Sequence, residues 1–168
     1  DVIIENARAQ DLTAFLNKLE EAGANYELGE YGIRFYYSEP LRATQVTTQV
    51  EPGFMTDWQP LWATLMTQAT GESTIHETIM ASRFQYVDDL AQMGAKIEAF
   101  APQVDNPEEL YNFDLKNDLP NAQHAIKITG PSLLKAGNFN VQDLRHGATL
   151  VLAAMAAQGT TTIQGVEH

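Results

Sequence analysis

An aspartate and two arginines are the side chains of this sequence best suited to chemistry on an anionic substrate. Asp57 lies in PGFMTDWQ, residues 52–59, where a turn leads into a helix-like pattern. A carboxylate at such a junction can act as a general base, and it can also stabilise the positive end of a helix. The residues alone favour the second role, because aspartate is common as a helix cap.

Arg83 and Arg145 are informative because cations are rare in this chain. It has ten lysines and arginines against 22 acidic residues, and a formal net charge of −12. A guanidinium group can hold a carboxylate or a phosphate through two hydrogen bonds. Equally, Arg83 can be an ordinary surface cation, and Arg145 can pair with Asp143 or cover apolar surface with its stem.

A helix is predicted from Thr56 to Ala69, around Asp57, with Asp57 or Gln59 as alternative starts because Pro60 is tolerated only in the first turn. Thr56 and Gln59 match a capping box, so Thr56 is the predicted N-terminal cap. Gly71 is predicted to end the helix, and both tryptophans are expected in the core. One buried helix face is indicated by apolar side chains at helical spacing, namely Trp58, Leu61, Trp62, Leu65, Met66 and Ala69.

The remaining pattern predicts further short strands and helices that would hold these side chains in place. A helix is predicted from Asp11 to Gly23, and Met80–Arg83 is expected to be a connection. Strands are predicted at Asp1–Ile4, Tyr26–Leu28, Ile33–Tyr37, Thr44–Val50 and Thr74–Thr78, the second and third of these forming a hairpin.

An internal repeat accounts for nearly the whole chain. LEEAGANYE, from residue 19, resembles LAQMGAKIE, from residue 90. The series Asp57, Gly71, Ile75 is matched by Asp143, Gly159, Ile163, which predicts a second helix over 143–158 and a strand over 160–163. We therefore predict an α/β fold of two similar units, about 1–82 and 83–168, that share their packing.

The second unit is interrupted by Asn106–Asn121, which is acidic and rich in Asn and Pro. Such a segment is typical of a solvated surface loop. The four histidines lack ligand spacing and the chain has no cysteine, so neither a metal nor a cofactor is expected. The acidic net charge argues against nucleic acid and anionic membranes as partners.

Four segments resemble the enolpyruvyl transferase family, and the first is most similar to its members that act on UDP-N-acetylglucosamine. They are PGFMTD from residue 52, ETIMASRF from 77, VDDLAQMGAKIE from 87 and QDLRHGATLVLAAMAAQGTTTI from 142. Four matches in the right order and at the right separations are specific. The resemblance implies an inside-out α/β barrel, of which this chain holds two of the three units of one domain.

The resemblance also implies roles for individual residues. Family enzymes join the enolpyruvyl group of phosphoenolpyruvate to a sugar hydroxyl and release phosphate. In that reaction Asp57 matches the general base, while Arg83 and Arg145 match arginines around the carboxylate and phosphate. Ile79 and Met80 match positions that touch the nucleotide sugar. Substrate-binding positions are thus implied at Thr56, Ile79, Met80 and Asp143, with Thr56 and Asp143 acting first as caps.

The resemblance places the chain in a cytoplasmic enzyme of peptidoglycan synthesis. A second domain and a third unit are expected as partners, so the chain alone is expected to be inactive and to associate through uncovered surface. Two other hypotheses stay open. One is a fragment of the related enzyme that acts on shikimate phosphate, and the other is a catalytically silent assembly module with the same fold.

Overall fold

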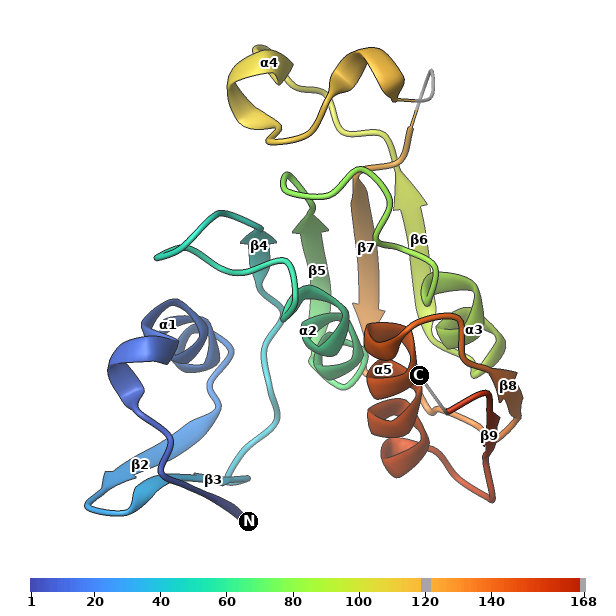
Figure 1. Ribbon diagram of the computed structural model, residues 1–168. Helices are drawn as coiled ribbons and strands as arrows, with labels where there is room; N and C mark the ends of the chain where they lie inside the picture. The colour runs from blue at the N-terminus through green and yellow to red at the C-terminus, as the bar shows by residue number, and fades with distance from the viewer. Residues whose placement is uncertain (119–121, 167–168) are drawn as a thin grey trace.

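The computed structural model describes residues 1–118 and 122–166 as short helices and strands (Figure 1). None of the helices described is long and apolar enough to cross a lipid bilayer. In chain order the elements are β1 (Val2–Glu5), η1 (Ala9–Leu12), α1 (Thr13–Glu21), β2 (Asn25–Gly29), β3 (Gly32–Tyr36), β4 (Gln45–Thr47), α2 (Gln59–Met66), β5 (Gly71–His76), α3 (Val87–Gln92), β6 (Lys96–Phe100), α4 (Pro107–Leu110), η2 (Leu115–Asn117), β7 (Ala125–Gly130), β8 (Asn138–Asn140), α5 (Leu144–Ala156) and β9 (Thr162–Gln164).

The order and pairing of the strands recur in the two halves of the chain. In the first half β3 lies between β1 and β2, antiparallel to both, and in the second half β7 lies in the same way between β5 and β6. The parallel pair β4 and β5 recurs as the pair β8 and β9. Strand β5 belongs to both patterns, because it pairs with β4 on one side and β7 on the other. The prediction of repeated α/β units is confirmed.

The repeat extends to single backbone hydrogen bonds after the first helix of each half. Ala24 N donates to Leu19 O at 2.8 Å, and Ala95 N donates to Leu90 O at 2.9 Å. The glycine before each alanine has a positive φ, 78° in the first half and 98° in the second. An L side chain is strained in that conformation, so the Gly-Ala turn found in the sequence has a conformational cause.

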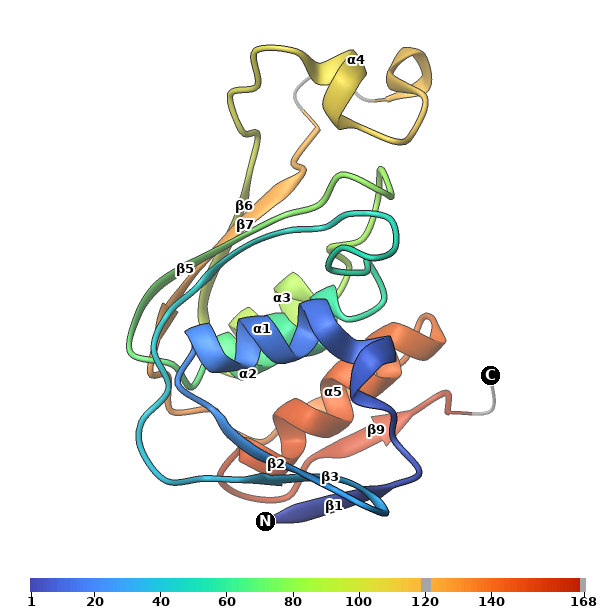
Figure 2. The ribbon, with the colours of Figure 1, turned by 90° about the vertical axis from the view of Figure 1, so that its left-hand side faces the viewer.

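Helices form the inner layer, and the sheets lie around them (Figure 2). An aromatic cluster joins α1, α2 and the segment before α2: the Trp62 ring of α2 lies 5.7 Å from that of Phe15 in α1 and 5.5 Å from that of Phe54 in the preceding segment. Trp62 is buried, as predicted, while Trp58 is half-buried at the edge of the same cluster. This packing holds the N-terminus of α2, and the Asp57 segment before it, in a fixed place.

The strands leading to the site are displaced from their predicted bounds. Strand β4 ends at Thr47 rather than Val50, and β5 runs over Gly71–His76 rather than Thr74–Thr78. Beyond these ends Thr48 and Thr78 bind each other through side chains: Thr78 N donates to Thr48 Oγ1 at 2.8 Å, and Thr78 Oγ1 donates to the Thr48 carbonyl. Local hydroxyl bonds replace the sheet ladder there.

The acidic insertion is more ordered than a solvated loop. Its described part contains α4 and η2, and two aromatic side chains pack at the end of the four-stranded sheet. The Tyr111 ring lies 5.5 Å from that of His76, and the Phe113 ring 4.9 Å from that of His124. The loop prediction is wrong for these two residues, because aromatic burial outweighs the acidic composition. The predicted segment's last three residues, 119–121, lie outside the described residues.

Candidate active site

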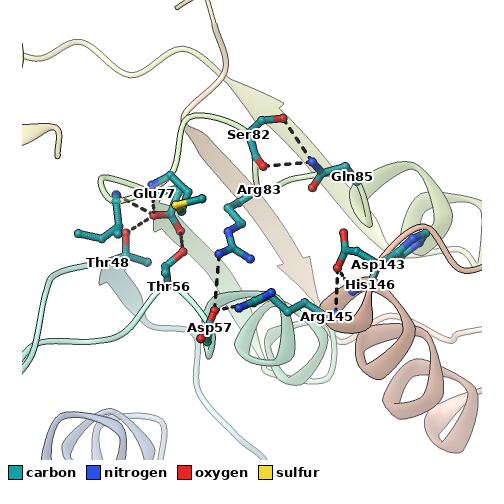
Figure 3. A network of polar contacts seen from close by, with 12 residues as sticks. Thr48, Thr56, Asp57, Glu77, Ser82, Arg83, Gln85, Asp143, Arg145 and His146 are labelled. Carbon is teal, nitrogen blue, oxygen red and sulfur yellow. Dashed lines mark hydrogen bonds and ion pairs between the residues drawn. The ribbon is translucent and has the colours of Figure 1, made fainter. Parts of the chain in front are cut away.

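Three segments far apart in the chain bring Asp57, Arg83 and Arg145 together (Figure 3). Asp57 precedes α2, Arg83 lies between β5 and α3, and Arg145 is in the first turn of α5. Arg145 Nε donates to Asp57 Oδ1 at 2.5 Å, and Arg83 Nη2 lies 3.6 Å from the same oxygen. One carboxylate oxygen is thus shared by two guanidinium groups, and the three side chains together carry one net positive charge.

The arginines control the ionisation of the aspartate. The hydrogen bond from Arg145 is the main cause that lowers the pKa of Asp57 below its usual range; partial burial opposes it, and the charges of Arg145 and Arg83 add to it. The same bond raises the pKa of Arg145. Asp57 is therefore ionised at neutral pH, as a base must be, but it is a weaker base while Arg145 holds it.

Arg83 is not the surface cation that its residue type allows. Its side chain is 16% exposed, whereas that of Asp57 is 56% exposed. Its Nε is buried and has no hydrogen-bond partner among the described residues. A buried guanidinium group is stable only when its charge and donors are matched. The position of Arg83 therefore favours the binding of an anion next to Asp57.

The N-terminus of α5 is organised as the sequence predicts. Asp143 caps the helix by accepting from Arg145 N at 2.9 Å and from His146 N at 3.0 Å. The Arg145 side chain is directed to Asp57 instead, so the alternative of an Arg145–Asp143 side-chain pair is wrong. His146, which was given no role, is buried; its Nδ1 accepts from Gln142 N at 3.2 Å and its Nε2 contacts Asp89 at 2.7 Å.

The predicted capping box before α2 does not form. The helix begins at Gln59, its N-cap position is Trp58, and no side chain caps it. Thr56 instead donates its hydroxyl to Glu77 Oε2 at 2.8 Å, and Asp57 faces the two arginines. The Thr56 cap is wrong, because the buried Glu77 carboxylate accepts the Thr56 hydroxyl. Asp57 makes no cap hydrogen bond either, since its carboxylate pairs with the two arginines.

Glu77 is the polar group at this site to which the sequence pattern assigned nothing. It is completely buried, and it accepts hydrogen bonds from Thr48, Thr56 and the backbone N–H groups of Ile79 and Met80. The available signal was its position: a glutamate that directly follows an alternating strand and opens the ETIMASRF segment. Ile79 is half-buried and Met80 is 42% exposed, both on the connection that leads to Arg83.

This arrangement, an ionised carboxylate between two guanidinium groups on an α/β scaffold, has the charge needed to hold an anionic ligand. The chain belongs to the family described as EPSP synthase (3-phosphoshikimate 1-carboxyvinyltransferase), which it matches over residues 1–168.

Within that family its relatives have one particular name. The chain is 36% identical over 166 residues to the UDP-N-acetylglucosamine 1-carboxyvinyltransferase of Protochlamydia amoebophila, which covers 98% of this chain and 34% of the relative. The protein of the same name from Chlamydia muridarum is 38% identical over 94% of this chain and 35% of its own length. The chain thus spans about a third of these relatives' length.

Solved structures agree with the fold. The enolpyruvyl transferase NikO from Streptomyces tendae matches with a TM-score of 0.74 and 25% identity, over 94% of this chain and 32% of that one. An EPSP synthase from Acinetobacter baumannii matches with a TM-score of 0.63 and 15% identity, over 96% of this chain and 34% of that one. The second likeness concerns the fold alone.

Proposed function

We propose that this chain is part of a UDP-N-acetylglucosamine 1-carboxyvinyltransferase. Such an enzyme transfers the enolpyruvyl group of phosphoenolpyruvate to the 3′-hydroxyl of UDP-N-acetylglucosamine in peptidoglycan synthesis. The observation that carries the proposal is the Asp57 carboxylate between Arg83 and Arg145. The relatives' shared name supports this sugar substrate over shikimate phosphate. The paired charges also argue against a silent assembly module, since such a module has no need of them.

Each of the three side chains has a role in the proposed reaction. Asp57 takes the proton of the sugar hydroxyl as the hydroxyl oxygen adds to the central carbon of phosphoenolpyruvate and the methylene carbon takes up a proton. Loss of a proton from that carbon, together with cleavage of the C–O bond to phosphate, then restores the double bond and gives the enolpyruvyl ether and free phosphate. Arg83 holds the carboxylate and Arg145 the phosphate, where fixed positive charge stabilises the developing anion. An anion that draws Arg145 away from Asp57 removes the main cause of its low pKa, so binding of that substrate strengthens the base.

The remaining candidate positions are expected to orient the substrate. Ile79 and Met80 form an apolar contact for the nucleotide sugar, and the exposed part of Met80 is available for it. Asp143 has one oxygen, Oδ1, engaged by the helix N-terminus. Thr56 donates its hydroxyl to Glu77. A ligand contact is therefore proposed through the other oxygen of Asp143 and the acceptor side of the Thr56 hydroxyl.

The proposed enzyme extends beyond this chain. We propose that residues 1–82 and 83–168 are two of the three units of one domain, and that a third unit and a second domain supply further contacts to both anionic substrates. A cytoplasmic location follows from the proposal, because both substrates are cytoplasmic metabolites. The proposed role thus belongs to the complete protein rather than to these two units alone.

Replacement of the base tests the proposal in the complete protein. Asp57→Asn keeps the shape of the side chain and removes its ability to accept a proton, so turnover is expected to fall by about a hundredfold or more. The exposed Asp105 provides a control of identical chemistry, Asp105→Asn, which is expected to leave turnover unchanged. Phosphate release from phosphoenolpyruvate plus UDP-N-acetylglucosamine is the assay. Full activity in Asp57→Asn would refute the assignment.

A further inference from the structure

We propose that Glu77 is a positioning residue that fixes the segment of the base against the segment of the sugar-binding positions. The inference rests on the proposed function for its catalytic meaning, and on geometry alone for its structural meaning. Within the described residues, Glu77 forms no hydrogen bond or ion pair with the three proposed catalytic side chains. It acts on them through the backbone of the Thr56 and Ile79–Met80 segments.

The carboxylate of Glu77 joins three separate segments of chain. Its Oε1 accepts from Thr48 Oγ1 at 2.8 Å, from Ile79 N at 2.8 Å and from Met80 N at 3.1 Å. Its Oε2 accepts from Thr56 Oγ1 at 2.8 Å. The segment after β4, the loop before α2 and the connection after β5 therefore meet at one buried group, as Figure 3 shows beside Arg83.

The four hydrogen bonds suit a carboxylate at this position, since the backbone N–H groups of Ile79 and Met80 can only donate. Each of the four partners is an N–H or O–H donor, and a carboxylate is an acceptor at both oxygens. The Thr48 hydroxyl is held from two sides, because it accepts from Thr78 N at 2.8 Å and donates to Glu77 at 2.8 Å. Hydrogen bonds to an ionised acceptor are stronger and geometrically stricter than neutral ones, so the arrangement suits a fixed support.

The hydrogen bonds of Glu77 hold two segments that carry proposed site residues. Thr56 is bonded directly to Glu77 and is the residue before Asp57, so its anchored hydroxyl restricts where the Asp57 carboxylate can lie. Ile79 and Met80 are anchored on the opposite side of the same carboxylate, four and three residues before Arg83. Placing reacting groups within a fraction of an ångström is what such supporting bonds achieve.

One arm of the test leaves the charge of Glu77 untouched and uses the 168-residue chain. Thr56→Val removes the hydroxyl that donates to Glu77, and Thr56→Ser restores it. We expect the NMR titration of the Asp57 carboxyl to show a pKa nearer the ordinary aspartate value in Thr56→Val, because its contact with Arg145 loosens. In Thr56→Ser the low value should return. Identical titration curves in all three proteins would overturn the proposal.

The other arm removes the charge. Glu77→Gln is compared with Glu72→Gln, which makes the same change at an exposed position of strand β5. Amide exchange at Ile79 and Met80 is expected to become at least about tenfold faster in Glu77→Gln, because a neutral amide is a weaker acceptor than a carboxylate. It should be unchanged in Glu72→Gln. Unchanged exchange in Glu77→Gln contradicts the proposal, and if that variant does not fold the Thr56 pair still decides.

Enzyme kinetics of the complete protein test whether the hydrogen bonds of Glu77 affect catalysis. With Thr56→Val and Thr56→Ser, we expect kcat to fall by about tenfold in the first and to recover in the second, since a displaced base is a less effective one. Intact kinetics in Thr56→Val together with an altered Asp57 titration would show that the support does not serve the reaction. Absence of transferase activity in the unmodified protein would refute the proposed function, while the two NMR arms would still test the positioning.

Discussion

The ion pair between Asp57 and Arg145 should be measurable as a small coupling that depends on pH and salt. The perturbation is a double-mutant cycle of Asp57→Asn and Arg145→Gln, with the free energy of unfolding measured for all four proteins. The two side chains are 56% and 41% exposed, so solvent screens them, and exposed pairs contribute about 0.2–1 kcal/mol. We expect a coupling of roughly 0.5 kcal/mol at neutral pH.

The sign of the pH dependence follows from the lowered pKa of Asp57. A carboxyl group whose pKa is lower in the folded than in the unfolded state stabilises the fold above its unfolded pKa. That contribution is lost as the pH falls through the folded pKa. The coupling should therefore be complete above a pH of about 5 and decline below about 4.

Urea denaturation at several pH values and at low and high salt is the assay. Screening lengths fall from about 10 Å at 0.1 M salt to about 3 Å at 1 M, so the coupling should shrink in high salt. Asp57→Asn alone should lower the free energy of unfolding more than Arg145→Gln alone, because it also removes the counter-charge of the more deeply buried Arg83. A coupling of zero at pH 7, or one that is equally large at pH 3, would refute this reasoning.

Three further predictions concern the chain as it stands. His146→Ala should lower the free energy of unfolding by about 1–3 kcal/mol, because it leaves the partly buried Asp89 carboxylate and the backbone N–H of Gln142 without their partner; urea denaturation checks this, and no loss would contradict it. Self-association is expected through the exposed apolar face of α5, where Met155 is 79% exposed. Sedimentation should show Met155→Glu weakening it and Tyr37→Glu leaving it unchanged. Finally, the chain alone should release no phosphate from the two proposed substrates, because an incomplete site does not exclude water. Phosphate release that disappears in Asp57→Asn would contradict this.

Periodic segments of the fold were predictable because their physical causes are local. Apolar spacing identified α2 and α5, and the glycine turns marked the ends of α1 and α3. The repeat was visible because both halves need the same left-handed glycine between the same helix and strand. The bounds of β4 and β5 were less accurate, since the threonine bonds that replace the ladder depend on two segments meeting in space.

The sequence predicted which residues meet at the candidate site, but not which hydrogen bonds they make there. Resemblance selected Asp57, Arg83 and Arg145, whereas residue types alone favoured a helix cap for Asp57, a surface cation for Arg83 and a pair with Asp143 or an apolar covering role for Arg145. The Thr56 cap failed because Glu77, 21 residues away in sequence, takes the hydroxyl. A capping pattern covers only a few neighbouring residues, so it cannot include an acceptor as distant in sequence as Glu77. Glu77 itself was passed over because a glutamate is usually exposed, and its burial is apparent only once its four donors are in place.

Strand β5 links the two halves of the chain through its two strand pairings. It is the last strand of the first unit by its pairing with β4 and the first strand of the second by its pairing with β7. A cut on either side of β5 leaves one half with an open sheet edge and an incomplete inner layer. The candidate site depends on the same strand, since Asp57 lies before β5, Arg83 lies after it, and Arg145 is on α5. Damage to this one strand would therefore move Asp57 and both arginines relative to one another, so the geometry of the candidate site depends on the stability of the sheet.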